Sequence, residues 1–369
     1  MLSYISKLKL TNYRNFENLN LEFPGSSIAL VGKNGVGKTN ILEAISIMQP
    51  GRGIRSAKIT DISRNNANFF GVFVELLLGN EKIQIGTEYN KKISRVRKIK
   101  INKNYYISQM ELIKYLRIIS LSPSMDGMFI DSPHSRRKFI DRITWNFYGN
   151  HSQLINSYDQ LIKERNNILR ENILDHGWIK NVEKQIVDFG SNILINRNKI
   201  LSLLASELEN RVDHIKVFPA PDIFLSGEVE EIFGSNNVEN FKEIYKEKLF
   251  NSRSLDSLKG STGFGPHRSE LSVNFKEKKI PAYLCSTGEQ KILLISIILA
   301  TARASKDFHG SSPILLLDEV FSHLDEVRRE ALSREIIDIG IQAWMTSTEA
   351  SHYMTFGGKS YIINLDEIV

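Results

Sequence analysis

The sequence lacks the features that mark secreted and membrane proteins. Cys285 is its only cysteine, so no disulfide can form within the chain and nothing indicates an oxidising compartment. The first residues contain no apolar segment of the kind that a signal peptide needs. The longest strongly apolar run, residues 292–300, is far shorter than the roughly 20 residues of a membrane-spanning helix. We therefore expect a cytoplasmic protein with no membrane partner.

Internal repeats, low-complexity segments and sustained heptads are also absent, which excludes a fibrous or largely disordered chain. The 41% hydrophobic and 24% charged residues are typical of a globular protein. Basic residues outnumber acidic ones by 48 to 42, a mild excess that permits a nucleic-acid partner without requiring one. At about 150 residues per domain, a chain of 369 residues indicates two domains or one large unit.

Apolar patterning divides the chain into three parts. In the first part short apolar runs alternate with turn residues, and residues 28–31 are expected to form a buried strand. From about 136 to 214 apolar residues recur every three or four positions, and no proline occurs between Pro133 and Pro219. This pattern predicts several long helices. Strands return in the last part, where residues 314–317 are the clearest example.

Residues 32–39 read GKNGVGKT, which matches the phosphate-loop pattern in full. The glycines allow backbone N–H groups to point at a phosphate, and an amphipathic helix is expected to follow. Lys38 would bridge the β- and γ-phosphate oxygens, and the Thr39 hydroxyl would ligate Mg²⁺. A glycine-rich turn with a stray lysine is the much weaker alternative. The residues expected to bind nucleotide are Gly32, Lys33, Asn34, Gly35, Val36, Gly37, Lys38 and Thr39.

The expected strand 314–317 ends in two carboxylates, Asp318 and Glu319. In a nucleotide site the first holds Mg²⁺ and the second polarises the attacking water. Two adjacent buried carboxylates would be costly without a cation nearby. Such strand ends are often only solvated, but the phosphate loop favours the functional interpretation. No Asn-Lys-x-Asp stretch is present, which disfavours a guanine-specific enzyme.

A second phosphate-facing element begins at Ser286, where STGEQK opens a helix that is apolar nearly all round. Ser286 and Gly288 offer a hydroxyl, backbone N–H groups and the positive end of the helix dipole. Ser286 and Glu289 are also three residues apart, so an ordinary capping box is the alternative. The position of this element shortly before Asp318 favours phosphate binding.

The order of these elements resembles that of the ABC-type ATPases, which have a phosphate loop, a signature serine, an acidic strand end and an S-x-L-D loop. Here that loop is SHLD at 322–325. GKNGVGKTNILEAI after an N-terminal LKLTNYRNF is similar to the SMC-like branch that works on DNA. SPHSRRKFIDR at 132–142 and GPHR at 265–268 resemble blocks of the RecF family of bacterial recombination mediators. The resemblance spans the whole chain.

The resemblance implies an α/β fold, a P-loop ABC-type ATPase head with a mixed sheet plus an inserted α-helical arm. Residues 1–133 and 261–369 would form the two-lobed head, and residues 134–260 the arm. Two heads would dimerise face to face in an ATP-dependent manner, with ATP and Mg²⁺ between them.

The resemblance also assigns roles at that interface. Asp318 would ligate the metal and Glu319 would be the general base. Ser286 and Gly288 would reach the γ-phosphate held by the other chain, and Asp325 would lie at the dimer seam.

The implied activity is a weak DNA-dependent ATPase of recombinational repair and replication maintenance. It would bind single- and double-stranded DNA at gaps or junctions near the nucleoid, contact a RecR-type partner, help to load RecA recombinase and support SOS induction. Transporter-type heads end the next strand in a switch histidine, whereas residues 341–345 here are followed by Thr346-Ser347-Thr348. Hydroxyls orient water less well than imidazole, so we expect slow hydrolysis.

Residues 91–103 carry seven basic side chains and no acid, with apolar positions between them. We expect a strand pair with one cationic face that contacts the DNA backbone. Lysine protection of an edge strand is the alternative that stays open. Arg136, Arg137 and Lys138 are a possible second contact, but pairing with a carboxylate of the same chain is as plausible. The residues expected to contact nucleic acid are Lys91, Lys92, Arg95, Arg97, Lys98 and Lys100.

Three other functions are compatible with part of the pattern. A transporter ATP-binding subunit would have a short helical insert, and a structural SMC-type tether would need hundreds of residues of heptads. A DNA-binding module with a vestigial nucleotide site is disfavoured because every phosphate-contacting residue type is present.

Overall fold

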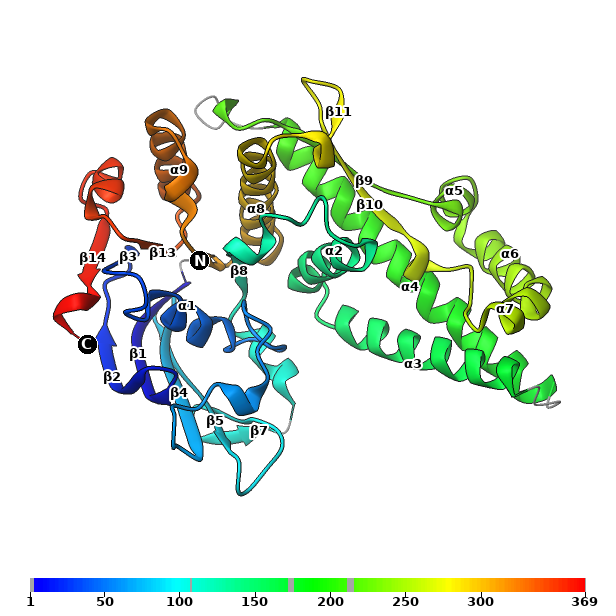
Figure 1. Cartoon of the computed structure of the whole chain (residues 1–369), viewed down its shortest axis with the longest axis horizontal. Coiled ribbons are helices and arrows are strands. Elements are labelled where there is room, and N and C mark those ends of the chain that lie inside the picture. Colours follow the sequence, from blue (N-terminus) through cyan, green and yellow to red (C-terminus); the bar gives the residue numbers. More distant parts are fainter. Residues whose placement is uncertain (1–2, 107, 172–175, 211–215, 369) are drawn as a thin grey trace. The chain divides into compact units, whose positions relative to one another are not determined.

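A computed structural model describes residues 3–106, 108–171, 176–210 and 216–368 (Figure 1). The chain forms two compact units. Unit 1 comprises Met1–Gly127, Glu207–Ala220 and Ser286–Val369, and unit 2 comprises Met128–Ser206 and Pro221–Cys285. No helix in the described ranges is long and apolar enough to cross a membrane. The expected division into a head (residues 1–133 and 261–369) and an arm (residues 134–260) is a division by function, and it stays a prediction.

Among its described residues, unit 1 contains two sheets and, apart from the last residues of a helix that belongs mainly to unit 2, three α-helices. Its helices are α1 (Lys38–Ser46), α8 (Thr287–His309) and α9 (Glu326–Ile339). Its strands are β1 (Ser3–Tyr13), β2 (Phe16–Glu22), β3 (Ser27–Val31), β4 (Phe69–Leu78), β5 (Glu81–Asn90), β6 (Lys98–Ile101), β7 (Asn104–Tyr106), β8 (Ile118–Leu121), β12 (Ile314–Leu317), β13 (Ala343–Ser347) and β14 (Ser360–Asn364).

The first sheet is entirely parallel, in the order β14-β3-β13-β12-β8. Every residue of β3, β12 and β13 is buried. This burial explains why their sequences are continuous apolar runs rather than alternating ones. The strands expected at 28–31 and 314–317 are confirmed. Because all five strands run the same way, their carboxyl ends meet at one edge, where the functional site lies.

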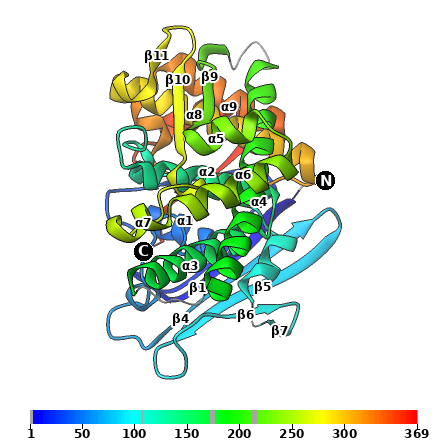
Figure 2. The same cartoon turned by 90° about the vertical axis from the view of Figure 1, so that its right-hand side faces the viewer.

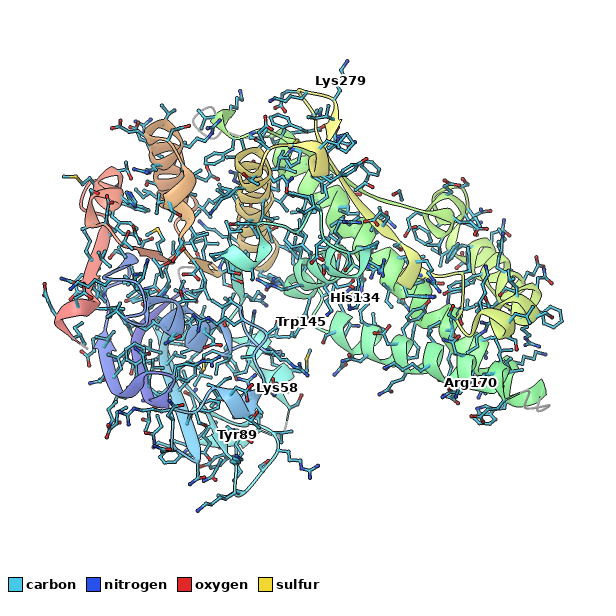
Figure 3. The ribbon with its side chains drawn as sticks, in the orientation of Figure 1. Lys58, Tyr89, His134, Trp145, Arg170 and Lys279 are labelled. Atoms are coloured by element: carbon cyan, nitrogen blue, oxygen red, sulfur yellow. The ribbon has the colours of Figure 1, made fainter. Side chains whose placement is uncertain are left out.

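The second sheet is antiparallel, in the order β2-β1-β4-β5-β6-β7. Burial alternates along β4 and β5, so one face is apolar and the other faces outward. Tyr89 on β5 packs inward against Phe70, with ring centroids 5.8 Å apart (Figure 3). The inner face joins α1 and the parallel sheet in one continuous core.

Unit 2 is mainly helical, as the spacing of apolar residues predicts. Its helices are α2 (Pro133–Phe147), α3 (His151–Arg170), α4 (His176–Glu209), α5 (Glu228–Gly234), α6 (Val238–Asn251) and α7 (Arg253–Lys259). Its strands β9 (Pro221–Ser226), β10 (Glu270–Phe275) and β11 (Ile280–Pro281) form a small antiparallel sheet. The sequence pattern did not predict β9, which lies within residues 134–260, the stretch that the family resemblance implies to be a helical arm.

Buried polar groups hold the helices of unit 2 together. The guanidinium of Arg165 on α3 is fully buried and donates to Glu183 on α4 at 3.0 Å and to Asp256 on α7 at 2.7 Å. Figure 2 shows α3 running beside α4. Nearby, His267 donates from Nε2 to the carbonyl of Thr262 and accepts at Nδ1 from the Tyr158 hydroxyl. Both ring nitrogens of His267 are thus engaged in bonds within unit 2, so His267 is a structural residue.

Candidate nucleotide site

The site lies at the carboxyl edge of the parallel sheet, where loops after neighbouring strands converge. The phosphate loop, residues 32–39, follows β3 and leads into α1. β13 lies between β3 and β12, so Thr346 near its end is placed between the phosphate loop and Asp318. Sheet topology thus brings together residues that are about 300 positions apart in the sequence.

Contacts from the turn between β1 and β2 fix the shape of the phosphate loop. Asn15 Nδ2 donates to the Val36 carbonyl at 2.8 Å. Gly37 has φ 115°, a left-handed conformation that disfavours any side chain. A Cβ at Gly37 would also lie 2.6 Å from the Phe16 ring. The N-terminal segment LTNYRNF therefore supports the phosphate loop directly, through Asn15 and Phe16.

Lys38 lies inside the loop and is only 5% exposed. Its Nζ donates to the carbonyls of Gly32 and Lys33. Burial lowers the pKa of this amine, and the nearby carboxylates of Glu319, Asp366 and Asp318 act in the opposite direction. The ammonium is therefore held where its charge is only partly compensated, which suits it to bind an anion.

Asp318 is the centre of a hydrogen-bonded cluster. Thr39 Oγ1 donates to its Oδ1 at 3.0 Å, and Thr346 Oγ1 donates to the same oxygen at 2.7 Å. The Asp318 carboxylate is buried, and two hydroxyl donors compensate part of the cost of burying it. A hydroxyl and a carboxylate in contact offer the oxygen ligands that Mg²⁺ prefers.

Glu319 has an unusual backbone conformation for a residue with a side chain. Its φ and ψ are 51° and 30°, in the left-handed region, and its side chain is exposed. Its N–H donates to Thr346 Oγ1 at 2.8 Å. Non-glycine residues in this region carry strain that the surroundings must support, and they concentrate at functional sites.

The hydroxyl run after β13 differs from the expectation. β13 extends to Ser347, and Thr346 is completely buried, so its hydroxyl does not face an attacking water. Thr346 instead links the Asp318 carboxylate to the Glu319 backbone. From the sequence, Thr346 was notable only because it stands where transporter-type heads have a switch histidine. The sequence did not reveal its bonds to Asp318 and Glu319.

Asp366 is a further residue that the sequence did not reveal. It lies just after β14, which pairs with β3, and its carboxylate accepts from the Lys33 N–H at 3.1 and 3.2 Å. The same carboxylate packs against Gly32. The C-terminal segment thereby anchors the beginning of the phosphate loop.

The other two predicted nucleotide elements have exposed helix N-termini. Ser286 caps α8 in a complete capping box with Glu289, and Ser286 and Gly288 are exposed. The capping-box alternative therefore describes the local bonds correctly, and the contact with a second chain's phosphate stays a prediction. Asp325 caps α9 and pairs with Arg328.

Within the described part of the chain, no group of three or more His, Cys, Asp or Glu residues could hold a metal ion by itself. Mg²⁺ commonly uses one or two protein ligands together with phosphate oxygens and water. Thr39 and Asp318 fit that donor set.

The basic segment departs from the expected strand pair. Residues 91–97 are the connection between β5 and β6, and Lys91, Lys92, Arg95, Lys98 and Lys100 are exposed. The expectation that Arg97 faces solvent is wrong, because it is buried and donates to the carbonyl of Gly51 at 3.1 Å and to Gln109 Oε1 at 2.7 Å. We therefore leave Arg97 out of the nucleic-acid contacts.

Two arginines at the start of α2, Arg136 and Arg137, form hydrogen bonds within the chain. Arg136 binds the Glu270 carboxylate through two nitrogens, and Arg137 donates to the Ser269 carbonyl at 2.9 Å. For Arg136, pairing with a carboxylate of the same chain is the observed arrangement.

Comparison with known proteins decides the family. Residues 4–361 match the model of the RecF/RecN/SMC N-terminal domain. The DNA replication and repair protein RecF of Rickettsia canadensis (strain McKiel) is 38% identical over 362 residues, covering 98% of this chain and 99% of that protein. RecF of Rickettsia akari (strain Hartford) is 40% identical over 371 residues, again covering 98% and 99%. The chain belongs to the RecF family.

Solved structures agree with this assignment at the level of the fold. The structure described as the recombination mediator protein RecF-ATPrS in the RecFOR pathway has a TM-score of 0.83 at 24% identity, covering 95% of this chain and 94% of that one. An Smc head domain from Pyrococcus furiosus has a TM-score of 0.54 at 16% identity, covering 96% and 92%. The expected fold, an ABC/SMC-type ATPase head with a helical insert, is confirmed.

RecF-family membership also disfavours the transporter subunit and the long structural tether. The family is that of proteins of DNA replication and repair.

Proposed function

We propose that this protein is an ATP-switched DNA-binding protein of recombinational repair and replication maintenance. One observation carries the proposal: Thr39, Asp318 and Thr346 form a single hydrogen-bonded cluster beside a full phosphate loop. That arrangement belongs to a nucleotide hydrolase rather than to a passive DNA-binding module. In this scheme residues 1–133 and 261–369 act as the head and residues 134–260 as the arm.

The residues of the cluster have complementary tasks. The loop N–H groups and Lys38 would bind the phosphates, and Thr39 and Asp318 would hold Mg²⁺. The ion would supply positive charge that offsets the charge of the phosphates. The exposed Glu319 carboxylate accepts the proton of the attacking water. Thr346 keeps Glu319 in place but presents no group to the water, so hydrolysis is slow.

ATP binding drives formation of a homodimer. Ser286, Gly288 and Asp325 are exposed at helix N-termini, where a second copy can reach them. The dimer holds DNA at gaps or single-strand/double-strand junctions, and hydrolysis releases it. A RecR-type partner, help in loading RecA recombinase and a part in SOS induction follow from the family, with the bacterial nucleoid as the place of action.

A sizing experiment tests this proposal. The molar mass is measured by light scattering with and without ATP, and with and without gapped DNA, for the natural protein and for Lys38→Met. We expect ATP to convert the natural protein from monomer to dimer, whereas Lys38→Met stays monomeric with an unchanged unfolding midpoint. A natural protein that stays monomeric under all four conditions would refute the proposed switch.

A further inference from the structure

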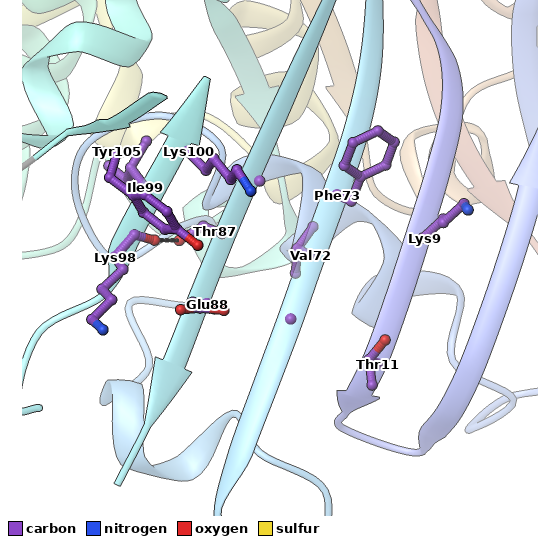
Figure 4. A pocket seen from close by; sticks show the side chains of 12 residues that line it. Lys9, Thr11, Val72, Phe73, Thr87, Glu88, Lys98, Ile99, Lys100 and Tyr105 are labelled. Carbon is purple, nitrogen blue, oxygen red and sulfur yellow. Dashed lines mark hydrogen bonds between the residues drawn. The ribbon is translucent and has the colours of Figure 1, made fainter. Parts of the chain in front are cut away.

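The outward face of the antiparallel sheet carries a row of side chains in register across five strands. Lys9 on β1 pairs with Phe73 on β4, Phe73 with Gly86 on β5, Gly86 with Lys100 on β6, and Lys100 with Tyr105 on β7. Figure 4 shows Lys9, Phe73, Lys100 and Tyr105 on this face. With neighbouring strands ~4.8 Å apart, the row spans about 19 Å.

The sheet is hollow at the centre of this row because Gly86 and the nearby Gly71 lack side chains. Gly86 lies in the row itself. Gly71 lies on β4, two residues before Phe73, and pairs with Glu88 on β5. Together they leave a cavity of about 370 Å³ floored by bare backbone. Both backbones are extended, so the turn geometry that usually requires glycine does not explain them. Glycine within a strand often marks a place where another molecule approaches closely.

Cationic and aromatic groups alternate around the hollow. Lys9 Nζ lies 6.0 Å from the centroid of Phe73, and Lys100 Nζ lies 5.0 Å from the centroid of Tyr105. Tyr105 is 66% exposed, although burial would be favourable for so large a ring. Lys98 adds a third ammonium, and Glu88 is the single acid among the lining residues.

We infer that this row binds single-stranded nucleic acid. Phosphates pair with Lys9, Lys98 and Lys100, while bases stack on Tyr105 and Phe73 and lie against the bare backbone at Gly86. Sequence-independent single-strand sites combine these same elements, a cationic track and aromatic platforms. The inference rests on the proposed function only in taking nucleic acid as the ligand, and it needs neither ATP nor a dimer.

Two other ligands would use the charges but not the hollow. In a duplex the bases are stacked on one another, so only its phosphates can reach this face. An acidic peptide would pair with the lysines without needing planar groups against the glycine floor. The hollow and the exposed ring therefore distinguish a single strand from both.

The test fills the hollow and leaves every charge in place. A Cβ added at Gly71 or Gly86 would have no neighbour closer than 3.9 Å, so Gly71→Val and Gly86→Val fit the backbone. Valine also favours strands, so the double variant should fold at least as well as the natural protein. Gln84→Val is the matched control, because Gln84 is exposed on the same strand but does not line the hollow.

Binding is measured on the full-length protein without nucleotide, by fluorescence anisotropy. The three probes are a 15-nucleotide oligothymidylate, a 15-base-pair duplex and a polyglutamate peptide. We expect the double glycine variant to lose at least ten-fold in affinity for the oligothymidylate and less than three-fold for the duplex, with Gln84→Val unchanged. Replacing thymine by 5-iodouracil and irradiating should crosslink the strand to Tyr105 or Phe73.

Three results would overturn the inference: no oligothymidylate binding by the natural protein at low salt, equal losses for duplex and single strand, or tighter binding of polyglutamate. Failure of ATP-dependent dimerisation in the sizing experiment would leave these measurements unaffected. The two proposals can therefore fail separately.

Discussion

The hydroxyl of Thr346 is the best place to perturb the nucleotide site without touching a group that would contact ATP. Thr346→Val keeps the shape of the side chain and removes one oxygen. That oxygen donates to Asp318 at 2.7 Å and accepts the Glu319 N–H at 2.8 Å. Both bonds are lost together, and the side chain is completely buried, so water cannot replace the oxygen.

The size of the effect follows from those two bonds. A hydrogen bond to a charged group contributes about 1.5–3 kcal/mol, and an unpaired buried N–H costs about 1–3 kcal/mol. Allowing for partial relaxation, we expect Thr346→Val to lower the free energy of unfolding by about 2–4 kcal/mol. The left-handed backbone of Glu319 also loses its anchor, so its carboxylate moves and ATP turnover falls at least ten-fold.

Urea unfolding measures the first effect, and steady-state ATP hydrolysis at saturating DNA measures the second. Thr346→Ser is the control, because serine keeps the hydroxyl and should retain most of both properties. The reasoning is refuted if the valine variant unfolds within 0.5 kcal/mol of the natural protein, or if serine and valine variants behave alike.

Three further predictions concern groups outside that cluster. Asp366→Asn should weaken ATP binding several-fold and speed hydrogen exchange of the Lys33 amide, because the amide loses a charged acceptor. Burial lowers the pKa of His267 to about 4. Between about pH 6.5 and 4 the unfolded chain therefore binds a proton at this histidine and the folded chain does not. The free energy of unfolding measured in urea should therefore fall as the pH drops from about 6.5 to 4, with His267 contributing at most about 3 kcal/mol, and that contribution should be absent in His267→Gln. Arg165→Met should cost about 3–5 kcal/mol by calorimetry, because it leaves buried carboxylates unpaired, and a neutral result would contradict the role given to Arg165.

The parts of the site that the sequence predicts are those governed by local backbone chemistry. The phosphate loop needs glycine at Gly37, because the loop's φ there is positive and the Phe16 ring fills the space of a Cβ. Likewise an apolar run flanked by turn residues predicts β3 and β12, because strands buried on both faces leave no alternation.

The rest depends on contacts between segments far apart in the sequence. Thr346 and Asp366 join the site because β13 and β14 flank β3, and no local pattern specifies that order. Arg97 was assigned to a cationic face because its neighbours are lysines. It turns inward because backbone carbonyls of a distant loop accept hydrogen bonds from its guanidinium. The sequence does not predict β9, because its six residues become a strand only by pairing with β10, about 45 residues later.

If ATP hydrolysis releases the protein from DNA, blocking hydrolysis must prolong its residence on DNA. The protein is loaded with ATP on surface-bound gapped DNA, free nucleotide is washed out, and the dissociation rate is followed for the natural protein and for Glu319→Gln. We expect Glu319→Gln to bind ATP and DNA normally but to stay on the DNA at least ten times longer. If both proteins dissociate at the same rate, release does not depend on Glu319 and the account is wrong.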